Sequence, residues 1–267
     1  MRERVMRSWL ILALVLTFSG AAQAQAAPHP DKEEACTTRA FEGSSFTVCA
    51  YRPARDRLRL AWAGPNGPLG DFRGLERSLG SRAAQVRFAM NAGMYDPKQA
   101  PVGLLVLRGH TEHAAETSNG TGNFYLKPNG VFWVGSDGAP HVEETGRFLA
   151  EAPKAQWATQ SGPLLVQSGQ LHPAIQPNGT SEFVRNGVGV AGRDLAYFVI
   201  SDAPVSFGRF ARFFREELHC QDALYFDGHI SSLWAPSLQR QDPRTGLGPL
   251  VVVMGRPKKN GERRAPR

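Results

Sequence analysis

The stretch Ala223-Leu-Tyr-Phe-Asp-Gly-His-Ile-Ser-Ser232 decides how the rest of the sequence is interpreted. Its apolar first half has strand character and stops abruptly at Asp227-Gly228, after which a histidine and two serines follow. A buried strand that ends in a carboxylate and a glycine-containing turn places that carboxylate at the rim of a sheet, where loops on a rigid scaffold carry binding and catalysis. We therefore expect this turn to belong to a functional site.

The same succession of strand and polar turn occurs at two other places. Gln85-Val-Arg-Phe-Ala-Met90 leads into Asn91-Ala-Gly-Met-Tyr95, and Trp157-Ala-Thr159 leads into Gln160-Ser-Gly-Pro163. Three such junctions in one chain predict one composite site, whereas a single junction would predict only a turn.

The polar residues of these turns are the candidates for binding and chemistry. Asp227 is the candidate catalytic carboxylate, although an Asp-Gly pair is also typical of a simple turn. Arg185 precedes another strand and is suited to clamp a phosphate or carboxylate in a bidentate manner, or else it is a surface charge. Glu182 is either a second carboxylate or the ion-pair partner of Arg185. The remaining candidates for substrate binding are Asn91, Gly93, Ser161, Gly162, Asn186, Gly228, His229, Ser231 and Ser232.

Standard nucleophile and nucleotide-binding motifs are missing from the sequence. There is no G-x-S-x-G elbow, no P-loop and no G-x-G-x-x-G after a strand. None of the seven histidines forms an H-x-x-x-H or H-E-x-x-H pair, so we predict no metal and no cofactor. A Ser161–His229–Asp227 triad remains an alternative, but Asp227 and His229 would point to opposite faces of an extended segment.

The N-terminal residues have the pattern of a secretory signal peptide. Arg2, Arg4 and Arg7 precede the apolar run from Trp9 to Phe18, and an Ala-rich exit with cleavage sites after Ala24 or Ala26 follows. The apolar run is about half of the ~20 residues that span a bilayer, and no second apolar run is long enough to form a membrane helix. Residues 1–26 are therefore expected to be a signal peptide, and the mature protein to be periplasmic or secreted, with no membrane span.

The formal net charge of +7 is concentrated at the two ends of the chain. The tail 256–267 holds six of the basic residues against one glutamate, and the signal adds three arginines against one glutamate, so the body is close to neutral. A nucleic-acid binder would show a basic stripe on the body, and we predict no such partner. The tail is expected to be a disordered, solvated end, with weak contact to an anionic envelope as the alternative.

Three cysteines, Cys36, Cys49 and Cys220, lie in the mature part of the chain. The segment between Cys36 and Cys49 has the pattern of two short strands around Glu42-Gly43. In an oxidising compartment these two cysteines are expected to form a disulfide, and Cys220 to remain a buried free thiol.

The pattern along residues 36–255 predicts an α+β fold: a single strand-rich domain with a mixed sheet and few flanking helices. Strand, turn and strand are expected at 123–134 and again at 187–200. One amphipathic helix is expected from Ser206 to Leu218, because its phenylalanines recur at three- and four-residue spacing. This helix leads directly into the strand that carries Asp227.

Four motifs in order resemble those of the phosphodiester glycosidase family, which includes the catalytic domain of the uncovering enzyme. Asn91-Ala-Gly-Met-Tyr95 is similar to the family's N-G-G-F-F turn, and Thr159-Gln-Ser-Gly-Pro-Leu-Leu-Val166 resembles its S-G-P-x-L-V strand. Arg185-Asn-Gly-Val-Gly189 resembles R-x-A-V-G, and Asp227-Gly-His-Ile-Ser-Ser232 resembles D-G-G-x-S-S. The chain departs from the pattern at Ala92, at Met94-Tyr95 and at His229.

The resemblance implies hydrolysis of a sugar-1-phosphodiester, such as a GlcNAc-1-phosphodiester, on the glycosidic side. The substrate would then be a small molecule or glycan with a sugar-1-phosphate linkage. Arg185 and the serines would hold the phosphate, and Asp227, with Glu182, would stabilise an oxocarbenium-like transition state or activate water. Two alternatives stay open: a non-catalytic exported domain that binds glycan or envelope, and a phosphodiesterase that attacks phosphorus.

Overall fold

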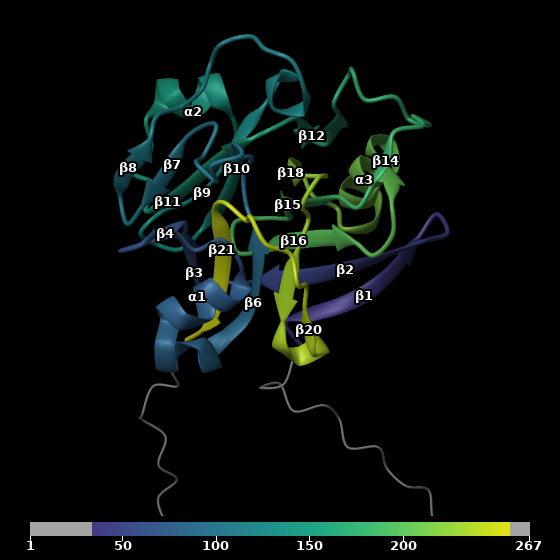
Figure 1. Cartoon of the computed structure of the whole chain (residues 1–267). Helices are drawn as coiled ribbons and strands as arrows, with labels where there is room; N and C mark the ends of the chain where they lie inside the picture. Colours follow the sequence, from purple (N-terminus) through teal and green to yellow (C-terminus); the bar gives the residue numbers. More distant parts are fainter. Residues whose placement is uncertain (1–33, 257–267) are drawn as a thin grey trace, which may run out of the picture. The chain divides into compact units, whose positions relative to one another are not determined.

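Residues 34–256, the part of the chain that the computed structural model describes, contain twenty-one strands, three α-helices and four 3₁₀- or π-helical segments (Figure 1). The predicted signal peptide and the tail beyond Arg256 lie outside these residues. Within the described part, no helix is long and apolar enough to cross a membrane.

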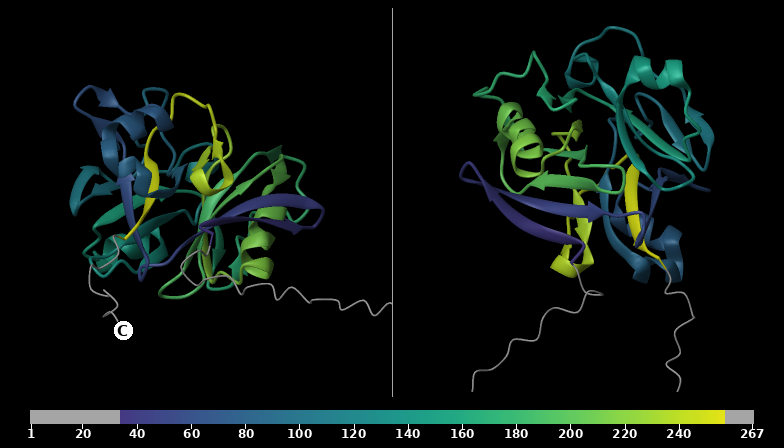
Figure 2. Two further views of the ribbon diagram at one scale, coloured as in Figure 1. Left: turned by 90° about the horizontal axis from the view of Figure 1, so that it is seen from below. Right: turned by 180° about the vertical axis from the view of Figure 1, so that it is seen from behind.

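The largest sheet has seven strands in the order β1-β2-β16-β15-β18-β12-β13. Its β1–β2 hairpin (purple in Figure 2) reaches helix α3, and Arg212 of this helix donates two hydrogen bonds to Glu42 of the hairpin turn. The bounds of the strands are β1 (Cys36–Phe41), β2 (Ser44–Tyr51), β12 (Leu164–Gln167), β13 (Gln170–Leu171), β15 (Asn186–Val190), β16 (Ala196–Ser201) and β18 (Asp222–Asp227).

Two five-stranded sheets complete the main framework. Their strand orders are β10-β9-β11-β7-β8 and β20-β19-β6-β21-β3. The first contains β7 (Leu105–Leu107), β8 (His110–His113), β9 (Gly130–Val134), β10 (Pro140–Glu144) and β11 (Trp157–Ser161). The second contains β3 (Asp56–Ala61), β6 (Val86–Asn91), β19 (Leu233–Ala235), β20 (Arg240–Gln241) and β21 (Leu250–Gly255). Two small pairs are β4 (Ala63–Gly64) with β5 (Gly67–Pro68), and β14 (Glu182–Phe183) with β17 (Val205–Ser206).

The inner faces of the three sheets share one apolar core, and each outer face is backed by one helix. The shared core includes Phe88 of β6, Phe132 of β9 and Phe226 of β18. Since side chains alternate along a strand, Tyr225 points to the opposite face from Phe226 and packs with Phe210 of α3. The helices are α1 (Phe72–Leu79), α2 (Thr145–Glu151) and α3 (Phe207–Arg212).

The helix predicted for 206–218 is confirmed, although it changes type midway. Ser206 caps α3 by accepting a hydrogen bond from the Arg209 amide, and a π-helical segment, η4 (Phe213–Glu217), continues it. Three short 3₁₀ helices occur elsewhere: η2 (Gly80–Gln85), η3 (Asn123–Tyr125) and η5 (Pro236–Leu238).

The predicted mixed sheet is wrong, because every strand pair in the described residues is antiparallel. A helix that leads directly into a strand, as here before Asp227, is also the arrangement found in parallel α/β units. Strand β18 instead pairs antiparallel with β15 and β12, so α3 covers the sheet without connecting parallel strands. The strand-rich α+β prediction itself agrees with the structure.

The predicted hairpin at 187–200 is confirmed as β15–β16, but the one at 123–134 is wrong. Residues 123–125 form a 3₁₀ turn in which Phe124 is buried, and the Asn129 side chain donates to its carbonyl. Strand β9 therefore pairs with β10 and β11.

The predicted disulfide is present between Cys36 and Cys49, which are paired residues of β1 and β2. Both are fully buried in the shared core. Cys220 is a buried free thiol, and burial raises its pKa to about 12.

We expect the double variant Cys36→Ala/Cys49→Ala to lose about 3 kcal/mol of unfolding free energy, because the unfolded chain regains the freedom of a short closed loop. Urea unfolding of the mature protein measures this loss. As a control, dithiothreitol should lower the stability of wild type toward that of the variant and leave the variant unchanged. Equal stability of oxidised wild type and variant would contradict the prediction.

Candidate functional site

The turn after Asp227 carries the chain from one sheet to another. Strand β18 of the seven-stranded sheet ends at Asp227, and β19 of a five-stranded sheet begins at Leu233. Asp227 is 9% exposed, and its Oδ1 accepts hydrogen bonds from the amides of Gly228 (2.5 Å) and His229 (2.6 Å). A carboxylate that accepts from the next two amides is held in one orientation at the strand end.

Glycine is required at position 228 by the close approach of the backbone to a tyrosine. A Cβ atom there would lie 2.0 Å from the Tyr225 hydroxyl oxygen and 3.4 Å from Nη1 of Arg185. The turn therefore rests directly on the Tyr225–Arg185 pair.

Arg185 is the largest fully buried side chain of the described residues. Its guanidinium donates to Val205 O (2.8 Å), the Tyr225 hydroxyl (3.0 Å) and Ser181 O (2.8 Å), and it stacks over the Phe207 ring at 3.7 Å. No ion pair with a carboxylate is found for it in residues 34–256, and burial lowers its pKa. Because it has no exposed surface, Arg185 does not present the open phosphate clamp that the sequence suggested.

Two asparagines connect the sheets behind the turn. Asn186 Nδ2 donates to the backbone oxygen (2.8 Å) and to Oδ1 (3.1 Å) of Asn91, and Asn91 Oδ1 also accepts from the Ser232 amide (2.8 Å). The Ser231 hydroxyl lies 3.2 Å from Asn186 Oδ1 and 2.8 Å from Val184 O. Asn91, Asn186 and Ser232 are fully buried, so in this structure they position the turn and do not face solvent.

The turns after β6 and β11 lie against the same region. A Cβ at Gly93 would be 2.2 Å from Gln160 O, and the Gly93 amide donates to Thr159 Oγ1 (3.2 Å). The buried Ser161 hydroxyl donates to Phe226 O (3.0 Å), one residue before Asp227. Gly162 is equally constrained, since a Cβ there would be 2.7 Å from Phe124 O. The structure thus brings the three strand ends together.

The side chains of Glu182 and His229 lie at the periphery. His229 is exposed, and its ring stacks on Phe183 with centroids 6.1 Å apart. Glu182 is also exposed and lines a separate cavity of about 360 Å³ with Arg209 and Arg212. Neighbouring strand residues point to opposite faces, which accounts for Phe183 facing His229 while Glu182 does not.

The alternative Ser161–His229–Asp227 triad is not assembled. The Ser161 hydroxyl bonds a backbone carbonyl, and the contact between His229 and Asp227 is made by the His229 amide and not by the ring. In the described part of the chain, no group of three or more His, Cys, Asp or Glu side chains is placed to hold a metal ion.

Two tyrosines lie near the carboxylate, and of these only Tyr225 lies outside the turns that were predicted to form the site. Burial, followed by the Asp227 charge, raises the pKa of Tyr95, and its buried hydroxyl lies without a well-formed hydrogen bond. Burial also raises the pKa of Tyr225, against the opposing effect of Arg185. Both hydroxyls are therefore protonated at neutral pH. Tyr225 lies in the apolar run before Asp227. In the sequence, its hydroxyl group was the one sign that it is more than a core residue.

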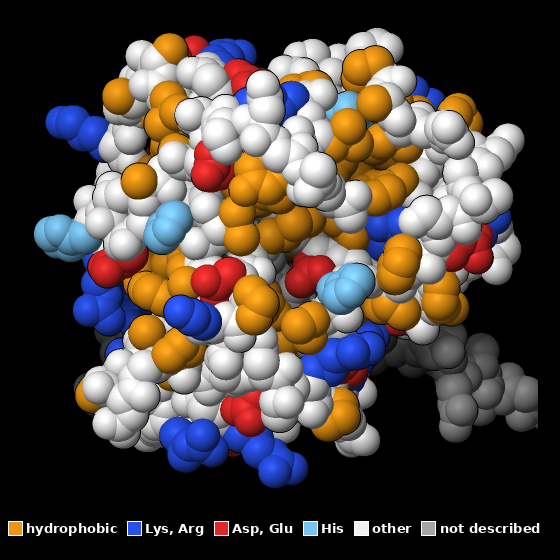
Figure 3. Space-filling view, turned by 45° about the horizontal axis from the view of Figure 1, so that its top comes forward, with side chains coloured by type: hydrophobic (Ala, Val, Ile, Leu, Met, Phe, Trp, Pro, Cys, Tyr) orange, Lys and Arg blue, Asp and Glu red, His pale blue; other side chains and the backbone are white. Residues whose placement is uncertain are grey.

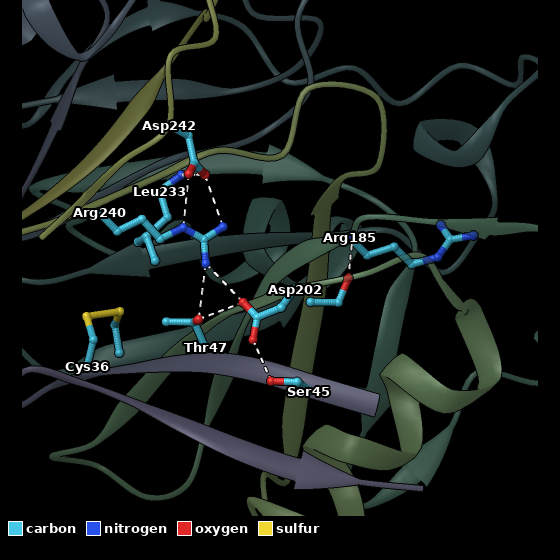
Figure 4. A network of polar contacts seen from close by, with 10 residues as sticks. Cys36, Ser45, Thr47, Arg185, Asp202, Leu233, Arg240 and Asp242 are labelled. Carbon is cyan, nitrogen blue, oxygen red and sulfur yellow. Dashed lines mark hydrogen bonds and ion pairs between the residues drawn. A yellow bond between two sulfur atoms is a disulfide. The ribbon is translucent and has the colours of Figure 1, made fainter. Parts of the chain in front are cut away.

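An ion-pair network anchors the strands that follow the turn (Figure 4). Arg240 donates to both carboxylate oxygens of Asp242 and, through Nη1, to Asp202 (3.0 Å). Asp242 accepts from the Leu233 amide, and Asp202 from Ser45 and Thr47 of β2. Leu233, the first residue after the turn, is thereby tied to the seven-stranded sheet.

One face of the molecule is hollowed, and hydrophobic, acidic and histidine side chains gather around the hollow (Figure 3). A concave surface with apolar walls and a few polar groups is typical of a site for a small ligand.

The chain belongs to the phosphodiester glycosidase family. A model of that family matches residues 84–267, more than half of the chain. The uncharacterized protein YigE of Escherichia coli strain K12 is 35% identical over 198 residues, which cover 73% of this chain and 77% of that protein. Among solved structures, the zebrafish N-acetylglucosamine-1-phosphodiester alpha-N-acetylglucosaminidase catalytic domain, auto-inhibited by its pro-peptide, has a TM-score of 0.57 at 12% identity. The match covers 83% of this chain and 82% of that one, and it shows a similar fold.

We expect Asn91→Ala and Asn186→Ala each to cost about 2 kcal/mol of unfolding free energy, because each leaves buried partners without a hydrogen bond. In a double-mutant cycle, the two losses should be non-additive by about 0.5–3 kcal/mol, since the residues share their bonds. Asn178→Ala, at an exposed position, serves as the control and should leave stability unchanged. Additive losses would show that the two asparagines act independently.

Proposed function

We propose that this protein is an exported hydrolase that cleaves the glycosidic bond of a sugar-1-phosphodiester, with Asp227 as its catalytic carboxylate. Membership of the phosphodiester glycosidase family supports the class of reaction. The observation that carries the proposal is the fixed Asp227 carboxylate at the convergence of three strand ends. A GlcNAc-1-phosphodiester is the substrate type that the family resemblance favours.

The geometry leaves one oxygen of Asp227 for chemistry. Oδ1 is occupied by two backbone amides, whereas Oδ2 makes no hydrogen bond within residues 34–256. In the proposed reaction the bond between sugar C1 and the phosphate oxygen breaks, and Oδ2 stabilises the positive charge that develops on the sugar. Water then attacks C1, and the products are the free sugar and a phosphomonoester.

A phosphate leaving group needs little help from a general acid, because it departs as a stable anion. This is consistent with a reaction in which Asp227 is the one catalytic carboxylate, since Glu182 lines a separate cavity with Arg209 and Arg212. We assign Glu182 no part in bond cleavage.

The buried Arg185 is proposed to act at a distance, as a positioning residue. Its charge lies behind Gly228, where it attracts an anionic substrate to the turn. In this proposal the phosphate contacts the accessible part of the turn, which is the exposed His229 and the partly exposed Gly228. Asn91, Gly93, Ser161, Gly162, Asn186, Ser231 and Ser232 hold the turn in place.

Export is proposed from two independent features. The signal-peptide pattern directs the chain out of the cytoplasm. The disulfide between Cys36 and Cys49 requires an oxidising compartment to persist.

The first experiment compares Asp227→Asn with Glu182→Gln, two matched changes of carboxylate to amide. With UDP-GlcNAc and methyl-phospho-GlcNAc as substrates, we expect Asp227→Asn to lose about 10²–10⁴ in turnover. Glu182→Gln should stay close to wild type. Retention of activity by Asp227→Asn would contradict the role of Asp227 as the catalytic carboxylate. Loss of activity in both variants would show that Glu182 also takes part in the reaction.

Hydrolysis in water enriched with oxygen-18 identifies the bond that breaks. The label should appear in the released sugar and not in the phosphate, because water attacks carbon. Label in the phosphate would instead show a phosphodiesterase. Binding of both substrates without turnover would favour a non-catalytic glycan-binding domain.

A further inference from the structure

A second concave site lies away from Asp227, between the edge strand β3 and the β7–β8 turn. A cavity of about 340 Å³ there has Arg59 of β3, Arg82 of η2 and Arg108 of the turn among its lining residues. We refer to these three arginines, together with Trp62 and Trp157 of the same lining, as the arginine groove. Trp157 and Ser161 stand at opposite ends of β11, so roughly 13 Å of strand separates the groove from the Ser161 end.

The three arginines are not neutralised by the protein. Within the described residues none of them forms an ion pair, and the one hydrogen bond is from Arg82 Nε to Leu79 O. Glu112 is the acidic residue of the lining, and it is exposed and unpaired. Burial, and then the charges of Arg82, Arg108 and Arg57, lower the pKa of Arg59. Arg59 is half-buried, and Arg82 and Arg108 are exposed, so all three guanidinium groups are open to an anion from outside the chain. Such an anion would reduce the repulsion between these like charges.

Arg108 is also held in a backbone conformation that disfavours side chains. Its φ is 55°, in the left-handed region, where an L residue costs about 1–2 kcal/mol. A glycine would fit this turn more easily, yet the position carries a guanidinium that lines the groove.

The floor of the groove is apolar. Trp62, Leu69, Leu79 and Trp157 are each partly buried, and each lines the cavity. The Trp62 indole nitrogen already donates to Gln99 O (2.7 Å), so that ring offers only its apolar surface. A neighbouring cavity of about 400 Å³ shares Arg59 and Trp157 and adds Arg57 and Arg256, which lengthens the groove.

We propose that the arginine groove binds a phosphate ester that carries an apolar portion. Guanidinium groups match phosphate geometry and bind it through two parallel hydrogen bonds, which inorganic phosphate and phosphate esters both permit. The apolar floor distinguishes between them, because it gains free energy only when hydrocarbon or ring surface covers it. The site is independent of Asp227 and of the reaction proposed there.

The test uses isothermal titration calorimetry of the mature protein with three probes: hexyl phosphate, inorganic phosphate and hexanol. We expect hexyl phosphate to bind at least about tenfold more tightly than either other probe, a difference of about 1.4 kcal/mol. The indole signals of Trp62 and Trp157 should shift in NMR spectra upon binding. Equal affinity for hexyl phosphate and inorganic phosphate would overturn the role of the apolar floor.

Variants locate the binding. Arg59→Gln/Arg108→Gln should weaken hexyl phosphate binding by at least about tenfold, whereas Arg193→Gln, the same change at an exposed arginine elsewhere, should not. The double variant should unfold at the same or a higher temperature, since it removes like-charge repulsion. The single variant Arg108→Gln should lose less affinity for hexyl phosphate than the double variant.

Asp227→Asn separates this proposal from the proposed catalytic function. Hexyl phosphate binding should persist in Asp227→Asn even where turnover is lost. Binding that survives Arg59→Gln/Arg108→Gln but disappears in Asp227→Asn would place the phosphate ester in the Asp227 site and overturn the proposal.

Discussion

The architecture of the candidate site depends on the buried contact between Asn91 and Asn186. Asn91 ends a strand of one sheet and Asn186 begins a strand of another, and their side chains are bonded across the gap. In an apolar surrounding, amide groups that satisfy each other fix one relative placement of two sheets, because any other placement leaves them unpaired. The Ser232 amide donates to Asn91 of the same pair, so the position of the turn from Asp227 to Ser232 is fixed relative to both sheets.

The burial of the Arg185 guanidinium is a second constraint on the fold. A guanidinium without solvent contact must be surrounded by acceptors, and the chain supplies two carbonyls, one hydroxyl and an aromatic face. These groups come from β17, β18, α3 and the segment before β14. The cation therefore organises the region behind Gly228, in place of the exposed anion clamp that its sequence position suggested.

The sequence predicted the elements with local signals and missed those set by distant contacts. Residues 187–200 contain a Gly-Arg-Asp turn between alternating runs, and the expected hairpin is present. Residues 123–134 contain an equally strong turn signal, Pro-Asn-Gly, but no hairpin forms there. Phe124 is instead buried in a 3₁₀ turn, and β9 pairs with β10. The strand ends at Asn91, Ser161 and Asp227 were predicted to meet, and they do. The burial of Arg185 was not predictable, because its three acceptors, Ser181, Val205 and Tyr225, lie in three separate segments.

The place of β21 in its sheet has a consequence for how the protein is made. Residues 250–255 lie between β6 and β3, with Leu250 opposite both Asn91 and Ala61. The sheet therefore has a vacant central position until β21 has been synthesised and lies between β6 and β3. Contacts of such long sequence separation form slowly. Strands β3 and β6 therefore complete their sheet only after the much later strand β21 has joined them, so the formation of this sheet is a late step in folding.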